Sequence, residues 1–122
     1  MKLLNSLYEI VSRTETPVIS FCVRLLPECF IYRAHFPGEP VTPGVCLIGM
    51  AVETAGAACG HDFELHEVVN AKFLKVVDPR ETSQLLITLK RIEKTENLTK
   101  IAADITSADG TTVFTRLSLL LA

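Results

Sequence analysis

One helix that is apolar on nearly every side places the strongest constraint on how this chain can fold. Thr42 is a suitable N-cap with Pro43 at the first helical position, and Gly60 marks the end of the helix. Residues 43–59 carry Val, Leu, Ile, Met or Ala at most positions, and Glu53 is their one charged residue. A helix without a polar face is buried on all sides. The rest of the chain must therefore wrap around it.

The segments outside this helix are expected to be mostly strands. Residues 2–12 have apolar residues at helical spacing and predict an amphipathic helix, whereas residues 30–33 predict a short extended segment that leads into His35. Runs of β-branched and aromatic residues predict strands over residues 18–25, 67–77, 83–93, 99–106 and 111–121. Asp109-Gly110 indicates a tight hairpin, and the polar residues 93–100 indicate another turn. The last four strands predict a meander. One buried helix with a long antiparallel sheet wrapped around it is an α+β arrangement.

The size and charge of the chain exclude several classes of protein. With 122 residues it predicts a single domain over residues 1–122, near the size at which association adds to stability, so a dimer is expected. No run reaches the roughly 20 apolar residues of a membrane span, and the first residues lack the continuous apolar core of a secretory signal. We therefore expect a cytoplasmic protein. A net charge of -2 argues against nucleic-acid binding.

The cysteines and histidines predict neither a metal site nor a disulfide framework. No two cysteines form a C-x-x-C pair, and each lies in or beside an apolar segment, which is typical of reduced, buried thiols. The residues concerned are Cys22, Cys29, Cys46 and Cys59, with His35, His61 and His66. Their spacing is not that of a zinc site, so no metal and no cofactor are expected.

The segment His35-Phe-Pro-Gly-Glu-Pro-Val-Thr-Pro-Gly44-Val45 predicts a site for an acyl thioester. Its prolines and glycines hold the backbone tightly next to an imidazole, whose ordinary pKa of about 6.5 leaves a neutral base available at neutral pH. The helix then begins with the free amides of Gly44 and Val45, where the positive end of the helix dipole can stabilise a negatively charged oxygen.

The sequence of residues 35–45, HFPGEPVTPGV, is similar to the HFPGxPxxPGV signature of the 3-hydroxyacyl-acyl carrier protein dehydratases of fatty acid synthesis. Residues 71–80 resemble the basic strand of the same family, and nearly the whole chain can be aligned with it. The resemblance implies a hotdog fold, in which a long antiparallel sheet wraps around one central helix. It also implies that His35 is the catalytic base and that Gly44 and Val45 supply the oxyanion donors.

The expected substrate is a thioester of acyl carrier protein, which is strongly acidic and needs local positive charge on its partner. Lys72, Lys75 and Arg80 are the candidate carrier-protein contacts, with Arg80 the best of them by resemblance to the family. The two lysines are an odd number of residues apart and so face opposite sides of a strand. The apolar residues expected to line the acyl chain are Phe36, Ile48 and Phe73.

Gly49 departs from the family, whose dehydratases carry Glu or Asp there, projecting into the partner subunit's site as the general acid. Glu53 lies one helical turn further on, about 6 Å along the axis, and is the candidate replacement. General acids and bases contribute about 10²–10⁴-fold each. Glu53 could equally be a structural residue paired with Arg33 or with a cation of a partner chain.

Three functions therefore stay open. The first is a lyase that dehydrates 3-hydroxyacyl thioesters to trans-2-enoyl thioesters in fatty acid or related lipid or polyene synthesis, with Glu53 as the acid. The second is a noncatalytic hotdog subunit or acyl-binding partner of an active dehydratase, in a homodimer or heterodimer. The third is an acyl thioesterase. An enzyme needs Glu53 to face His35 across the dimer interface, whereas a binding subunit tolerates Glu53 in any polar contact.

Overall fold

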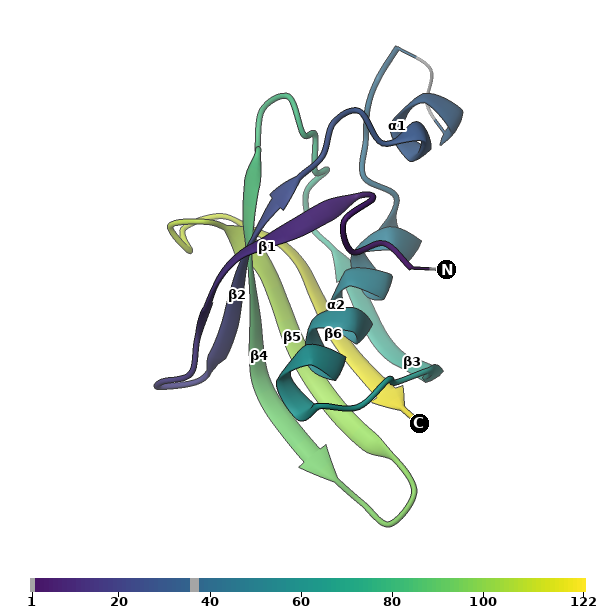
Figure 1. Ribbon diagram of the computed structural model, residues 1–122, viewed down its shortest axis with the longest axis vertical. Coiled ribbons are helices and arrows are strands. Elements are labelled where there is room, and N and C mark those ends of the chain that lie inside the picture. Colours follow the sequence, from purple (N-terminus) through teal and green to yellow (C-terminus); the bar gives the residue numbers. More distant parts are fainter. Residues whose placement is uncertain (1, 36–37) are drawn as a thin grey trace.

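A computed structural model describes residues 2–35 and 38–122, apart from the side chain of His35 (Figure 1). A six-stranded antiparallel sheet curves around one long helix, α2 (Gly44–Cys59). The strands are β1 (Tyr8–Thr14), β2 (Ile19–Leu25), β3 (Leu65–Phe73), β4 (Gln84–Lys94), β5 (Thr99–Ser107) and β6 (Val113–Leu121), in the spatial order β1-β2-β4-β5-β6-β3. The expected α+β architecture, with a long sheet wrapped around a buried helix, is confirmed.

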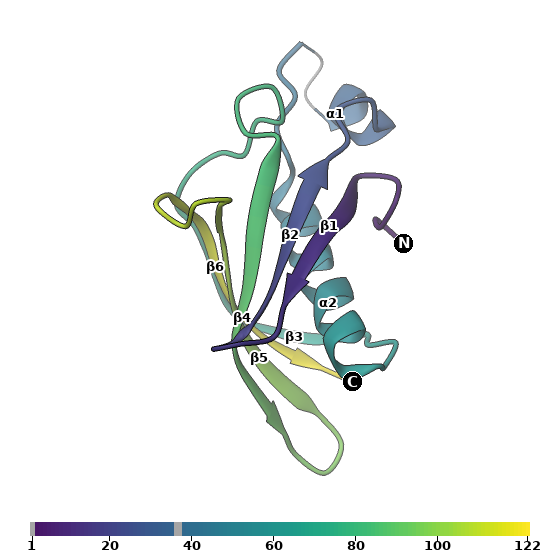
Figure 2. The same ribbon diagram turned by 60° about the vertical axis from the view of Figure 1, so that its left-hand side comes forward.

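The core lies between α2 and the concave face of the sheet (Figure 2). Alternate residues of β4, β5 and β6 point inward, as the period of two in a strand requires. The inward residues include Leu85, Ile87, Ile101, Ile105 and Leu119, all of them 0% exposed. Met50, Ala51 and Ala55 of α2 are also 0% exposed and belong to its buried face. The other side of the helix is half-buried or exposed, with Val45 67% exposed, so the expected burial on all sides holds only for the face toward the sheet.

The bounds of α2 agree with the sequence-based expectation at its C-terminal end and differ by one residue at its start. Gly60 ends the helix with a φ of 65°, a left-handed conformation that favours glycine, and its amide donates to the carbonyl of Gly56. Pro43 is the N-cap, with no side-chain hydrogen bond to the helix. The predicted cap at Thr42 is wrong because the Thr42 hydroxyl is hydrogen-bonded to Tyr32 instead.

The predicted meander holds only for β4, β5 and β6. Strand β3 pairs with β6 and not with β4. After β3 the chain passes β6 and β5 before β4 begins beside β2. This crossover leaves β1 and β3 as the two edges of the sheet. Both predicted hairpin turns are confirmed, at Asp109-Gly110 and at Thr95–Leu98.

Two predictions for the first third of the chain are wrong. The helix expected over residues 2–12 is a turn followed by β1, since Asn5 adopts a φ of 67° and residues 8–14 pair with β2. The extended segment expected over residues 30–33 belongs to a short helix, α1 (Phe30–His35), which packs Ile31 and Tyr32 into the core. In both segments the tertiary contacts override the local pattern.

The four cysteines are free, as predicted. Cys29 and Cys46 are buried, whereas Cys22 and Cys59 are half-buried. Within the described part of the chain, no helix is both long and apolar enough to cross a membrane.

Candidate active site

A hydrogen bond links α1, the helix that ends at the predicted base, to the residues just before α2. His35 is the last residue of α1, and Tyr32 of the same helix shares a hydrogen bond of 3.0 Å with the hydroxyl of Thr42, just before α2. Burial raises the pKa of Tyr32 to about 12, so its hydroxyl stays protonated. The Thr42 amide donates to the carbonyl of Val77 at 2.8 Å. These bonds tie α1 and the residues just before α2 to each other and to Val77. Phe36, which was expected to line the acyl chain, lies outside the described residues.

The start of α2 offers the predicted amide donors. The amides of Cys46 and Leu47 donate to the carbonyl of Pro43 at 2.9 and 3.2 Å. The amides of Gly44 and Val45 come before this first turn, and a helix has no internal acceptor for them. Val45 is 67% exposed, so the helix end is open to a ligand.

The ring of Phe73 lies directly against Gly44. A Cβ atom at residue 44 would be 2.8 Å from Cζ of Phe73, so only glycine allows this contact. A hollow of about 440 Å³ follows, lined by Val41, Thr42, Gly44, Leu47 and residues 73–77. The structure thus brings together two residues that the sequence assigned separately, Gly44 and Phe73. Ile48, also expected to line the acyl chain, is half-buried against the core and does not border this hollow.

Leu3 covers the place from which a side chain at residue 49 would project. A Cβ atom added to Gly49 would lie 2.7 Å from Cδ1 of Leu3. Leu3 is itself only 3% exposed. The space beside Gly49 is therefore not vacant, because a leucine from the start of the chain fills it.

Glu53 binds the same N-terminal segment. Its Oε2 accepts a hydrogen bond from the Leu3 amide at 2.8 Å, and its Oε1 accepts from the Leu4 amide at 3.0 Å and the Tyr8 hydroxyl at 2.9 Å. Burial, with Glu53 nearby, raises the pKa of Tyr8 above its usual range, so this hydroxyl remains a donor. The partners of Glu53 are thus two amides and a hydroxyl, not the Arg33 guanidinium that the sequence suggested.

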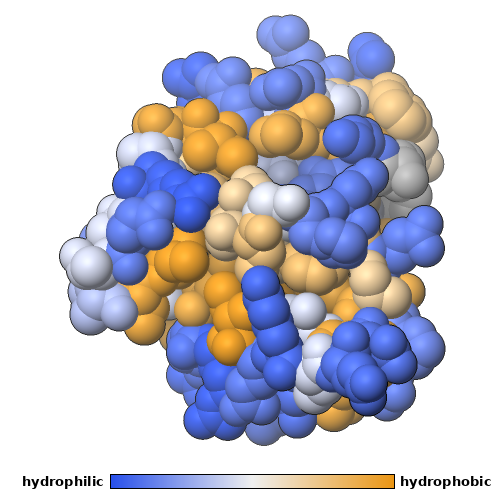
Figure 3. Space-filling model, turned by 60° about the horizontal axis from the view of Figure 1, so that its bottom comes forward, coloured by the Kyte–Doolittle hydropathy of each residue, from blue (hydrophilic) through white to orange (hydrophobic). Residues whose placement is uncertain are grey.

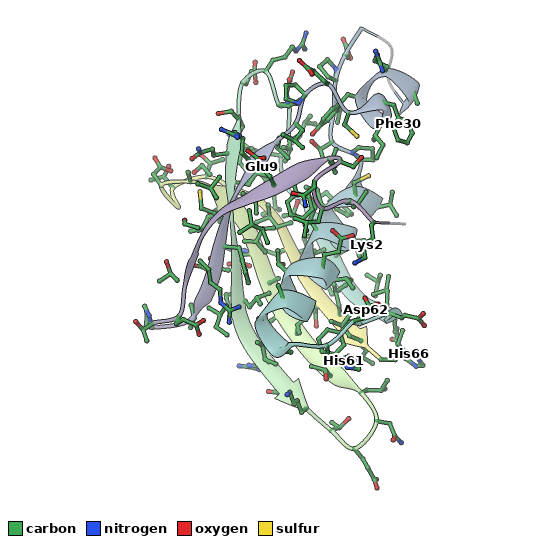
Figure 4. All side chains as sticks on the ribbon, in the orientation of Figure 1. Lys2, Glu9, Phe30, His61, Asp62 and His66 are labelled. Carbon is green, nitrogen blue, oxygen red and sulfur yellow. The ribbon has the colours of Figure 1, made fainter. Side chains whose placement is uncertain are left out.

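Residues 2–8, which we call the N-terminal hook, were missed as part of the site. Lys2 lies beside α2 (Figure 4) and borders a hollow of about 450 Å³ together with Glu53, His61 and Asp62. A lone carboxylate in an apolar helix requires nearby donors. The sequence therefore indicated that some other segment must donate hydrogen bonds to Glu53. The helical spacing of the apolar residues in the hook gave no indication that the hook is this segment.

The three basic residues expected to contact a carrier protein have different surroundings. Lys72 is exposed near the end of β3, and Lys75 is exposed beyond the end of that strand. The expectation that both lysines lie on one strand is therefore wrong. Arg80 forms an ion pair with Asp78, with 2.8 Å between Nη2 and Oδ2, and the pKa of the Asp78 carboxyl is lowered as a result.

The edge strand β3 and the residues after it expose an unusual amount of apolar surface. The side chains concerned are Leu65, Val68, Val69, Phe73, Leu74 and Val76, which are between 40% and 66% exposed. Figure 3 shows one face of the molecule, on which apolar patches lie between hydrophilic side chains. An apolar edge strand with unpaired backbone groups is a typical surface for association.

The comparison with protein families decides the family. The model of the ApeI-like family, described as ApeI dehydratase, matches residues 11–113. The chain belongs to the ApeI-like dehydratase family. Curated relatives include the 3-hydroxyacyl-[acyl-carrier-protein] dehydratase FabZ of Ligilactobacillus salivarius, 32% identical over 82 residues, which are 62% of this chain and 59% of the relative. FabZ of Latilactobacillus sakei is 31% identical over 70 residues, 52% of this chain and 50% of the relative. The chain thus spans little more than half the length of these curated relatives.

Solved structures confirm the hotdog fold of this ApeI-like chain. An uncharacterized protein from Erwinia carotovora subsp. atroseptica has a TM-score of 0.66 at 18% identity, covering 85% of this chain and 82% of that one. The dehydratase heterocomplex ApeI:P from Xenorhabdus doucetiae has a TM-score of 0.64 at 19% identity, covering 93% and 96%. A thioesterase from Haemophilus influenzae, HI1161, has a TM-score of 0.60 at 18% identity, covering 96% and 80%. These identities are too low to carry an activity from the solved structures to this chain.

Proposed function

We propose that this chain is the histidine-bearing subunit of a 3-hydroxyacyl-thioester dehydratase whose general acid comes from a second hotdog chain. The observation that carries this proposal is the closure of the acid position: Gly49 has no side chain and Leu3 fills the space above it. Glu53, the nearest carboxylate on α2, has both oxygens engaged by its own chain. His35 and the free amides at the start of α2 remain as the contribution of this chain to a site.

The proposed reaction is the loss of water from a 3-hydroxyacyl thioester of acyl carrier protein. His35 removes a proton from C2, and the electron pair of that bond forms the new double bond between C2 and C3. A carboxylic acid of the partner gives its proton to the hydroxyl, which leaves C3 as water. The amides of Gly44 and Val45 stabilise the charge that develops on the thioester oxygen. The product is a trans-2-enoyl thioester.

The partner we propose is a hotdog chain with Glu or Asp at the position that matches Gly49. The exposed apolar edge at β3 supports a docking surface for it. The fold similarity to a dehydratase heterocomplex supports two different chains in one assembly. Lys72, Lys75 and Arg80 stay candidate contacts for the acidic carrier protein, with Arg80 already sharing its charge with Asp78.

A dehydratase that works alone would have to use Glu53 as its acid. Glu53 would then give up hydrogen bonds to two backbone amides and to the buried Tyr8 hydroxyl. Leaving a buried donor without an acceptor costs about 1–3 kcal/mol. The observed contacts therefore favour a structural role for Glu53 and a two-chain site.

Reconstitution with a disabled partner tests the proposal. The chain is co-expressed with a carboxylate-bearing ApeI-like dehydratase whose own catalytic histidine is changed to alanine, and loss of water from a 3-hydroxyacyl carrier protein is followed by mass spectrometry. We expect no water loss by either chain alone, water loss by the complex, and none after His35→Ala. Water loss by this chain alone that Glu53→Gln abolishes would overturn the proposal in favour of a relocated acid. Release of the free fatty acid would identify a thioesterase instead.

A further inference from the structure

We propose that the N-terminal hook is a built-in plug that replaces the acid side chain, with Leu3 as the residue that excludes a side chain at position 49 and Glu53 as the anchor of Leu3. The proposal follows from contacts within one chain. Only the activity arm of its test rests on the proposed function.

The first step is that Leu3 has little freedom to move aside. The contact atom is a terminal methyl group, and such a group could normally rotate away from an added Cβ atom. Leu3 is 3% exposed, however, and belongs to the buried core, where close packing opposes a change of rotamer. A larger side chain at residue 49 therefore meets Leu3 within a packed layer.

The second step is that the backbone of Leu3 is held from two sides. Its amide donates to Glu53 at 2.8 Å, while its carbonyl accepts from the amides of Ser6 at 3.0 Å and Leu7 at 2.8 Å. Asn5, with its φ of 67°, turns the chain back so that this small loop closes. The hook cannot slide along α2 without breaking these bonds.

The third step is that Glu53 binds both ends of the hook. One carboxylate reaches Leu3 and Leu4 at the start and the hydroxyl of Tyr8 at the end, where Tyr8 is 0% exposed and enters β1. Glu53 is thus a positioning residue for Leu3. It stands one turn of α2 from Gly49, so the anchor and the excluded position share one face of the helix.

The consequence is that an acid cannot be restored at residue 49 by one substitution. Gly49→Glu places a carboxylate against Leu3, whereas Leu3→Ala first opens the space that it needs. The two positions are therefore expected to be strongly coupled, and together they limit this chain to the histidine side of a shared site.

Thermal unfolding of four full-length proteins tests the coupling: wild type, Leu3→Ala, Gly49→Glu and the double variant. We expect Gly49→Glu to lower Tm by about 5–10 °C more in the Leu3 background than in the Leu3→Ala background. If Gly49→Glu does not fold, Gly49→Ala replaces it. In the Leu3→Ala background Gly49→Ala should raise Tm by roughly a few degrees, because alanine has a higher helix propensity than glycine. Equal changes of Tm in the two backgrounds would overturn the proposal.

Gly56→Ala is the matched control on the same helix. A Cβ atom there would lie 2.7 Å from the backbone carbonyl oxygen of His61, which does not depend on Leu3. We expect Gly56→Ala to lower Tm by the same amount in both backgrounds. A Gly56 effect that also depended on Leu3 would show a general destabilisation by Leu3→Ala and would count against the plug.

Activity separates the plug from the proposed function. The double variant Leu3→Ala/Gly49→Glu, assayed as a homodimer with no second kind of chain, should dehydrate a 3-hydroxyacyl carrier protein at least about 10²-fold faster than Gly49→Glu, because residue 49 of each copy would face the site of the other. His35→Ala should abolish this gain. Coupled Tm values without any gain of activity support the plug and overturn the histidine half-site. Additive Tm values overturn the plug whatever the activity.

Discussion

At the scale of the residue, Glu53 shows how an apolar helix accommodates a carboxylate. Three donors from the N-terminal hook replace the water that the carboxylate loses. We predict that Glu53→Gln lowers the free energy of unfolding by about 1–3 kcal/mol, because an amide has only one acceptor oxygen for donors that used two. Urea denaturation measures this loss. Hydrogen exchange of the Leu3 and Leu4 amides with solvent should also become faster.

The exposed residue Glu28 provides a control for Glu53 because Glu28→Gln changes the net charge by the same amount on the surface. Its effect on the free energy of unfolding should stay within about 0.5 kcal/mol. Equal effects at the two positions would show that the hook does not depend on the Glu53 carboxylate.

The Tyr32 hydroxyl carries a second prediction at this scale. Tyr32→Phe removes the bond that ties α1 to the start of α2 and leaves the buried Thr42 hydroxyl without this partner. We expect the free energy of unfolding to fall by about 1–2 kcal/mol in urea denaturation. Thr42→Val should add little in the Tyr32→Phe background, because both variants remove the same bond. Fully additive losses would contradict the assignment.

At the scale of the element, local sequence patterns predicted the structure correctly where a single proline or glycine signal determines where an element begins, ends or turns. Pro43 and Gly60 bounded α2 to within one residue, and Asp109-Gly110 located a hairpin. They failed for residues 2–12, because the spacing of Leu3 and Leu7 suits a helix while β-pairing with β2 and the bonds to Glu53 select a turn and a strand. Glu53 is 50 residues from Leu3 in the sequence, so no local pattern reports this contact.

The hairpin between β5 and β6 should be sensitive to acid. The carboxylate of Asp109 accepts hydrogen bonds from Ser107 and Thr111, which lower its pKa to about 2 from an ordinary 3.8. Because the pKa of Asp109 is lower in the folded protein than in the unfolded chain, its carboxylate stabilises the folded hairpin at any pH above the unfolded pKa of 3.8. This contribution is lost as the pH falls from 3.8 through about 2. NMR titration of the Asp109 carboxyl and the Thr111 amide measures the midpoint. A midpoint near the ordinary value would contradict these bonds.

At the scale of the whole molecule, the signature around His35 predicted the family and the fold. It could not predict whether this chain has a carboxylate free to act as the acid of the site. By resemblance to the family, Gly49 predicted that an acid is absent there, and Glu53 was the candidate to replace it. Only the folded chain shows that Leu3 fills the space at Gly49 and that Glu53 holds Leu3 in place. The space beside Gly49 is thus filled by a segment some 45 residues away in the sequence.

The two edges of the sheet are expected to differ in association. Val69 lies on β3 and is 45% exposed, while Val11 lies on β1, the opposite edge, and is 51% exposed. We predict that Val69→Lys abolishes the complex with a carboxylate-bearing hotdog chain, because a charge in an apolar interface must be desolvated without a partner. Val11→Lys adds the same charge at a similarly exposed position and should leave the complex intact. Light scattering after size exclusion measures both, and circular dichroism checks that each variant folds. A complex that survives Val69→Lys but not Val11→Lys would place the partner on β1, the opposite edge of the sheet, and would contradict docking at β3.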